Sequence, residues 1–276
     1  MTKPRFILIT GCSSGIGYDA AHGLRARGWT VFASCRQEAD CARLRAEGFE
    51  SPLLDYTDPQ SIKSALAQVL ASSGGQLDAL FNNGAYALPG AVEDLPPDAL
   101  RAIFETNVIG WHDLTRQVIP TMRAQGAGRI VQCSSVLGLA PFPWRGAYVA
   151  SKYALEGLTD VLRLEMHGTG ISVSLIEPGP VTSKIRENAA VQFERWIDWQ
   201  NSARADEYAA LRKRLYEDSG PDKFELPASA VTAKLIHAIE APRPKARYFV
   251  TVPTYLSEIL RRLLPTSLRD AILRRG

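Results

Sequence analysis

The fold of this chain is decided by the stretch Thr10-Gly11-Cys12-Ser13-Ser14-Gly15-Ile16-Gly17. An apolar run from Phe6 to Ile9 precedes it and predicts a short strand, and a helical pattern follows from Gly15 to about Arg27. Glycines between a strand and a helix let the backbone turn tightly and approach a pyrophosphate, which the free N–H groups of the helix can bind. We therefore expect a phosphate cradle made of Gly11, Ser13, Ser14, Gly15, Ile16 and Gly17.

Outward from this turn, strand patterns alternate with helical patterns. The strands are expected at 6–9, 29–34, 51–55, 77–81, 129–133, 171–176 and 248–250. Helices are expected at 15–27, up to Gly48, from Asp58-Pro59, from Pro96-Pro97 to about Met122, at 147–166 and from Pro227. This alternation predicts an α/β fold: a doubly wound, Rossmann-like parallel sheet with helices on both faces, in one domain spanning 1–276.

Two segments depart from the alternation. Residues 183–226 are rich in charge, with aromatic residues interspersed, and interrupt the alternation between the sixth strand and the helix from Pro227. We interpret them as a helical lid over a substrate, and the alternative is a surface excursion. Residues 254–276 alternate leucines and isoleucines with arginines, which predicts an amphipathic segment broken near Pro265. It could pack on its own subunit, across a subunit boundary or on a membrane surface, in that order of preference.

The composition bounds the function. The 276 residues are 46% hydrophobic and carry a formal net charge of +3, which gives no electrostatic reason to expect a nucleic-acid partner. Cys12, Cys35, Cys41 and Cys133 form no Cys-x-x-Cys pair, so we expect reduced thiols, no metal site and a cytoplasmic protein. No apolar run approaches the roughly 20 residues that span a bilayer.

The candidate chemistry lies in Tyr148-Val149-Ala150-Ser151-Lys152. Residues four apart share one face of a helix, so the Lys152 ammonium is expected near the Tyr148 phenol. A nearby positive charge favours the phenolate, and we therefore expect the pKa of Tyr148 to lie below that of a free phenol. Such a group suits proton transfer to or from an alcohol. Taken alone, the pair also fits an ordinary exposed helix face.

Two further polar residues lie at suitable places along the chain. Ser135 ends the fifth strand, where its hydroxyl could bind a substrate oxygen. Asn107 lies in the long helix after the fourth strand, where an asparagine is mildly unfavourable. It could bind backbone or a water that leads to Lys152, and the alternative is a buried amide satisfied by its neighbours.

Together these motifs resemble the short-chain dehydrogenase/reductase family over nearly the whole chain, and the turn and basic C-terminus are similar to its steroid- and retinol-active branch. The resemblance implies that Tyr148 is the acid/base, Ser135 holds the substrate oxygen, Lys152 binds the nicotinamide ribose and Asn107 anchors a relay water. It also implies cofactor contacts for Asp55, Asn82, Pro178, Gly179, Val181 and Thr182. The chain has Asn82-Asn83-Gly84-Ala85 where the family usually has Asn-Asn-Ala-Gly.

Arg36 decides the expected cofactor. NAD-binding proteins of this fold usually end the second strand with an acid, whereas this strand is followed by Arg36, which can pair with a 2′-phosphate. NADP(H) is therefore favoured over NAD(H). Tyr86, Leu88, Pro89 and the apolar loop 137–144 favour a hydrophobic alcohol, aldehyde or ketone as substrate.

The leading prediction is thus an NADP(H)-dependent carbonyl reductase. The alternatives are an NAD-dependent alcohol dehydrogenase and a non-catalytic dinucleotide-sensing protein. The family resemblance implies a homodimer or homotetramer.

Overall fold

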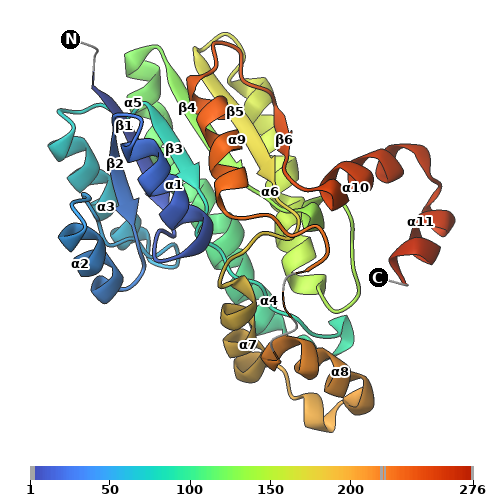
Figure 1. The fold of residues 1–276 in the computed structure, drawn as a ribbon. Helices are drawn as coiled ribbons and strands as arrows, with labels where there is room; N and C mark the ends of the chain where they lie inside the picture. The colour runs from blue at the N-terminus through green and yellow to red at the C-terminus, as the bar shows by residue number, and fades with distance from the viewer. Residues whose placement is uncertain (1–3, 218–219, 221, 275–276) are drawn as a thin grey trace.

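The computed structural model describes residues 4–217, 220 and 222–274. Its sheet contains β1 (Arg5–Thr10), β2 (Trp29–Ser34), β3 (Ala79–Asn82), β4 (Gly128–Cys133), β5 (Ile171–Glu177) and β6 (Arg247–Phe249). All neighbouring strands are parallel, in the order β2-β1-β3-β4-β5-β6 (Figure 1). The predicted doubly wound parallel sheet is therefore confirmed.

Eleven α-helices are assigned within the described ranges, together with four short helical turns. The α-helices are α1 (Gly15–Arg25), α2 (Glu38–Ala46), α3 (Pro59–Ser72), α4 (Pro97–Phe104), α5 (Gly110–Gln125), α6 (Gly146–Glu165), α7 (Ile185–Trp196), α8 (Ala205–Tyr216), α9 (Ser229–Glu240), α10 (Val252–Leu263) and α11 (Thr266–Leu273). The turns are η1 (Val92–Asp94), the π-helical η2 (Glu105–Ile109), η3 (Val136–Gly138) and η4 (Trp199–Asn201). No helix in the described part of the chain is long and apolar enough to cross a membrane.

The helices cover both faces of the sheet. Helices α1 and α9 pack together on one face, and α3, α5 and α6 lie on the other (Figure 1). The central strands are buried on both sides, and Ile7, Leu8, Leu80 and Phe81 have no accessible surface. Local sequence explains many helix boundaries. For example, Asp58 accepts a hydrogen bond of 2.8 Å from the amide of Gln60 at the start of α3.

Two predicted elements differ in the structure. The strand expected at 51–55 is wrong: this segment makes only isolated bridges, Glu50 with Phe32 and Leu53 with Cys35. Pro52 lies between them and has no N–H to continue a ladder of hydrogen bonds. The single helix expected from Pro97 to Met122 is divided into α4, the π-helical turn η2 and α5, and it ends three residues later, where Gly126 has a φ of 69°.

The two segments outside the alternation are helical. Residues 183–226 contain α7, η4 and α8, as expected. The C-terminal segment holds most of α10 and all of α11, and Pro265 lies between these two helices, where the break was predicted. Residues 218, 219, 221, 275 and 276 of the two predicted segments lie outside the described residues. Figure 1 shows α7 and α8 below the carboxyl ends of the strands, and α10 and α11 projecting from one side.

Candidate active site

The strand order reverses at β1, and the glycine-rich turn lies at the carboxyl end of this strand, where doubly wound sheets bind ligands. Gly11 and Gly15 have φ angles of 69° and 57°, in the left-handed region that glycine tolerates. A Cβ on Gly11 would lie 2.5 Å from the Cα of Gly84, which follows β3. Likewise, a Cβ on Gly17 would lie 2.3 Å from the backbone oxygen of Gly11. The sequence thus needs glycine to bring two strand ends and α1 together.

The start of α1 is suited to an anion. Ser14 is the N-cap residue, with extended backbone, but its side chain makes no capping hydrogen bond. The first amides of α1 therefore have no side-chain cap, and the positive end of the helix dipole faces the turn. Ser13 is exposed, whereas Ile16 packs partly against the core, so Ile16 can offer a ligand its backbone. This arrangement fits the pyrophosphate of a dinucleotide.

Two asparagines, at the end of β3 and directly after it, join the strand ends. The Asn83 side chain donates to the backbone oxygens of Thr10 and Gly11, at 3.0 and 3.3 Å. Asn82 is fully buried: its Oδ1 accepts from Tyr56 at 2.7 Å, and its Nδ2 donates to Thr115 at 3.0 Å. The Asn82 side chain therefore links elements of the protein, and its backbone is the part that could contact a ribose.

Tyr148 and Lys152 lie on one face of α6, as their spacing predicts. Both are buried, and the Lys152 Nζ lies 5.5 Å from the centre of the Tyr148 ring and 4.4 Å from that of Trp111. Ser135 is the N-cap residue of η3, and its Oγ accepts a hydrogen bond of 3.1 Å from the Leu137 amide. Its hydroxyl also lowers the pKa of Tyr148 through hydrogen bonding. The three side chains thus meet where β4 ends and α6 begins.

The expectation that the pKa of Tyr148 is lowered is wrong for the protein alone. Burial raises the pKa of this phenol well above its ordinary value, and hydrogen bonding with Ser135 offsets only part of the effect. The Lys152 ammonium is directed elsewhere, because it donates to the backbone oxygen of Cys133 at 2.8 Å. Burial also lowers the pKa of Lys152 to about 8. At neutral pH, Tyr148 of the protein alone is therefore a protonated phenol.

Asn107 lies in η2, the π-helical turn that interrupts the predicted long helix. Its Oδ1 accepts from the Tyr86 amide at 3.2 Å, and its Nδ2 donates to the Tyr86 oxygen at 2.9 Å and to Ser151 at 3.3 Å. The side chain therefore holds the loop after β3 against α6. These bonds use both N–H groups of the amide, so a relay water could bind the second lone pair of Oδ1 or the backbone of η2. Such π-turns are frequent at functional sites.

The remaining predicted cofactor residues surround the same edge of the sheet. Arg36 is exposed after β2, and among residues 4–217, 220 and 222–274 no hydrogen bond or ion pair engages its side chain. Arg36 follows the carboxyl end of β2 and therefore lies at the same edge of the parallel sheet as the glycine-rich turn. Burial raises the pKa of Tyr86 to about 12, and the positive charges of Arg195 and Arg36 partly oppose this shift. Asp55 is half-buried, and its Oδ1 accepts from the amide and hydroxyl of Thr57 at 2.9 and 2.8 Å.

The segment after β5 is held by the end of the inserted region. Val181 pairs with Leu226, and the Thr182 hydroxyl donates to Glu225 at 2.7 Å. A Cβ on Gly179 would lie 2.1 Å from the Thr251 hydroxyl oxygen, so the turn formed by Pro178 and Gly179 packs closely against the start of α10. Thr182 is exposed, and binding a carboxamide through its hydroxyl would compete with Glu225.

Tyr148 belongs to a second hydrophobic cluster, separate from the main core. The cluster combines Leu88, Ala147 and Tyr148 with residues of the inserted helices, namely Phe193, Ile197, Tyr208 and Leu211. The Tyr208 hydroxyl donates to Asp94 at 2.8 Å, which anchors α8 to η1. The inserted helices therefore cover the substrate side of Tyr148 with apolar groups. Their role as a lid stays a prediction.

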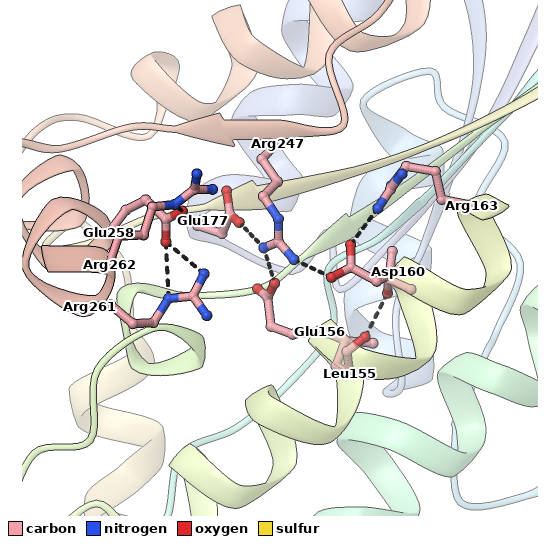
Figure 2. Close-up of polar contacts among 10 residues, drawn as sticks. Leu155, Glu156, Asp160, Arg163, Glu177, Arg247, Glu258, Arg261 and Arg262 are labelled. Atoms are coloured by element: carbon pink, nitrogen blue, oxygen red, sulfur yellow. Dashed lines mark hydrogen bonds and ion pairs between the residues drawn. The ribbon is translucent and has the colours of Figure 1, made fainter. Parts of the chain in front are cut away.

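A buried charge cluster behind Lys152 was not predicted. The Arg247 Nη1 donates to both Glu156 and Glu177, at 2.7 Å to Glu177, while Nη2 lies 2.7 Å from Asp160 (Figure 2). Burial and the neighbouring Glu156 raise the pKa of Glu177 to about 8. Glu156 is four residues after Lys152, so the spacing 148, 152, 156 along one face of α6 was the available signal.

Residues 5–192 match the model of the family described as short chain dehydrogenase, which covers more than half of the chain. The chain belongs to the short-chain dehydrogenase/reductase family. It is similar to the uncharacterized oxidoreductase YbbO of Escherichia coli strain K12, at 39% identity over 267 residues, or 97% of this chain and 93% of that protein. As a member of this family, the protein is an oxidoreductase with a dinucleotide-binding fold.

Other relatives differ in cofactor and substrate. The NADPH-dependent 3-dehydrocapnine reductase of Ornithobacterium rhinotracheale is 31% identical, covering 97% of this chain and 95% of that protein. Human retinol dehydrogenase 16 is 32% identical, covering 98% and 88%, which confirms the similarity to the steroid- and retinol-active branch. A short-chain dehydrogenase/reductase of Burkholderia phymatum solved in complex with NAD superimposes with a TM-score of 0.79, at 26% identity, over 99% of this chain and 96% of that one.

Proposed function

We propose that this oxidoreductase uses NADP(H) to interconvert a hydrophobic alcohol with its ketone or aldehyde, with reduction as the favoured direction. The observation that carries the proposal is the position of Tyr148, a buried and protonated phenol inside an apolar cluster and beside Ser135, at the same carboxyl edge of the parallel sheet as the glycine cradle. A buried acid of this kind can give its proton to a carbonyl oxygen without competition from water.

The residues present fit a dinucleotide. Gly11, Gly15, Gly17 and the uncapped start of α1 would bind the pyrophosphate, and Arg36 would bind the 2′-phosphate of NADP(H). Lys152 would bind the nicotinamide ribose, while Ser13, Ser14, Ile16, Asp55, Asn82, Pro178, Gly179, Val181 and Thr182 would complete the contacts. Once bound, the cofactor supplies or accepts the hydride.

The chain itself supplies orientation and the proton. Ser135 would hold the substrate oxygen next to the Tyr148 Oη, which would donate its proton to that oxygen as the alcohol forms. The ammonium of Lys152 would stabilise the phenolate left on Tyr148, and Asn107 keeps the Tyr86 loop in place beside it. The apolar cluster around Tyr148 excludes water and favours hydrophobic substrates.

Substitution of Tyr148 tests the reaction. The Tyr148→Phe variant should lose turnover of an apolar aldehyde by at least about a hundredfold, because it lacks the proton, and should retain its affinity for NADPH. Tyr153→Phe, on the same helix and partly exposed, is the matched control and should keep turnover. Unchanged turnover in Tyr148→Phe would contradict the proposed mechanism and favour a dinucleotide-sensing protein.

A separate titration tests the cofactor. NADPH should bind more tightly than NADH, and Arg36→Gln should weaken NADPH binding about 10- to 100-fold with little effect on NADH, because a charged contact to the 2′-phosphate is lost. Arg101→Gln, which removes an exposed arginine on α4, is the control. Equal effects of Arg36→Gln on the two cofactors would favour the alternative, an NAD-dependent alcohol dehydrogenase.

We also infer a cytoplasmic homodimer or homotetramer. Leu158, Val161 and Leu164 are exposed along the outer face of α6, where a second copy could bury them. Measurement of the molar mass by light scattering after size-exclusion chromatography tests this inference, and a monomer would contradict it.

A further inference from the structure

Helix α10 is amphipathic, but its polar side faces the protein and its apolar side faces outward. Its side chains that face the body of the protein are polar: Thr254 is fully buried and Glu258 is 5% exposed. The side chains that face outward are apolar, and between 46 and 74% of their surface is exposed: Val252, Tyr255, Leu256, Ile259 and Leu263. These residues recur every three to four positions and therefore form one stripe along the helix. A surface helix normally buries such a stripe.

Two buried polar residues mark the inward face of α10. The Glu258 carboxylate points inward, toward the Glu177 and Arg247 region, and binds Arg261 at 2.8 Å and Arg262 at 2.5 Å (Figure 2). Thr254 lies 3.2 Å from the Thr251 hydroxyl, next to the turn at Gly179. These ion pairs lie within α10 and would turn with it, but rotation of the helix to bury its apolar stripe would expose the buried Thr254 and Glu258 in exchange.

Helix α11 also exposes apolar side chains, and the segment that holds α10 and α11 carries positive charge. Leu268 and Ile272, one turn apart, are exposed on α11. Residues 252–274 contain four arginines and two acids, a net charge of +2, and Glu258 is paired with Arg261 and Arg262. Arg262 has 70% of its side-chain surface exposed. The outward face of α10 and α11 is therefore apolar with a basic border, the pattern of helices that lie in the headgroup region of a bilayer.

This face also adjoins the substrate side of the protein. A groove of about 400 Å³ lies between α11 and the loop before α6, with Leu273 and Arg274 on one wall and Pro141, Phe142 and Trp144 on the other. Trp144 packs against the apolar cluster that contains Tyr148. A molecule dissolved in a membrane under α11 would thus meet this groove first.

We propose that α10 and α11 bind an anionic lipid surface, with the apolar stripe inserted between the headgroups and the arginines paired with lipid phosphates. Charge favours lipid over a second copy of the chain, because two copies would bring two basic faces together, whereas anionic headgroups neutralise them. The membrane-side entry of a hydrophobic carbonyl substrate is the part of this inference that rests on the proposed function.

Flotation of the full chain with vesicles tests the binding and needs neither cofactor nor substrate. The protein should float with phosphatidylcholine vesicles that contain about 30% phosphatidylglycerol, and much less of it should float with vesicles of phosphatidylcholine alone. Adding about 0.5 M salt should reduce the fraction that floats with the anionic vesicles, because salt screens the charges. The double variant Leu256→Gln/Ile259→Gln should reduce the bound fraction about tenfold, because both side chains lie in the stripe. Val191→Gln, which replaces a comparably exposed apolar residue on α7, should float like the wild type.

The proposal is overturned if the protein stays in solution with anionic vesicles, or if the double variant floats unchanged. It is also overturned if the double variant converts an oligomer to a monomer, since the stripe would then be an interface between copies. A midpoint of thermal unfolding equal to that of the wild type would show that the double variant is folded. If the protein floats with anionic vesicles but reduces no apolar aldehyde, the lipid site is supported and the proposed function is contradicted.

Discussion

The Lys152 ammonium lies 2.8 Å from the backbone oxygen of Cys133, and this hydrogen bond ties the middle of α6 to the carboxyl end of β4. It fixes the ammonium beside the Tyr148 ring in a fully buried place. The strand that precedes Ser135 and the helix that carries Tyr148 are therefore held together by the side chain expected to support the reaction. The position of this charge leads to the first prediction.

Lys152→Met should lose turnover and change how stability depends on pH. Burial lowers the folded-state pKa of Lys152 to about 8, below its unfolded value of about 10.4. Between these values the unfolded chain binds more protons, so the stability of the wild type rises with pH. The free energy of unfolding of the wild type relative to Lys152→Met should therefore increase by up to about 3 kcal/mol from pH 8 to about pH 10. Urea unfolding at both pH values measures it, and a constant difference would contradict the burial effect.

Tyr148 should remain a phenol in the free protein up to alkaline pH. Burial raises its pKa, and hydrogen bonding with Ser135 only partly opposes the shift. The difference in ultraviolet absorbance between the wild type and Tyr148→Phe should therefore show no phenolate below about pH 10, the ordinary value for tyrosine. Phenolate absorbance near neutral pH would show instead that Lys152 controls this group without help from a cofactor.

Glu177→Gln should stabilise the protein in a pH-dependent way. The folded-state pKa of Glu177, about 8, lies above its ordinary value of about 4.3, so the folded wild type binds more protons between them and loses stability as pH rises. Glutamine does not titrate. Its advantage over the wild type should grow by roughly 1–3 kcal/mol from pH 5 to pH 8, as measured by urea unfolding. Glu165→Gln, at an exposed residue near the end of α6, controls for the substitution of glutamate by glutamine. A stability difference between Glu177→Gln and the wild type that shrinks as pH rises would contradict the prediction.

Gly11→Ala should destabilise the protein more than Gly74→Ala. Both glycines have nearly equal positive φ angles, 69° and 65°, so alanine costs about 1–2 kcal/mol at either place. At Gly11 the new Cβ would also lie 2.5 Å from Gly84, whereas nothing lies within 4 Å at Gly74. We expect an extra loss of about 1–3 kcal/mol at Gly11, together with weaker NADPH binding. Thermal unfolding and cofactor titration measure both, and equal losses would contradict the close approach of the two strand ends.

Much of the fold could be predicted because its signals are local. Apolar runs of strand length alternate with helical patterns, and residues such as Asp58 and Gly126 mark helix ends through their own side chain or backbone. The same reasoning failed at 51–55, where Pro52 limits pairing, and at η2, where packing against α6 favours a π-helical turn around Asn107. At η2 the outcome depends on contacts between distant segments, whereas Pro52 was a local signal that the prediction of a strand did not take into account.

The sequence by itself determined the parallel sheet, the glycine cradle, and the placement of Tyr148 and Lys152 on one helix face, because each follows from spacing along the chain. Only the tertiary structure decided the raised pKa of Tyr148, the partners of Asn82 and the outward-facing apolar side of α10. These properties depend on burial and on which distant groups meet, and neither quantity can be read from the spacing of residues.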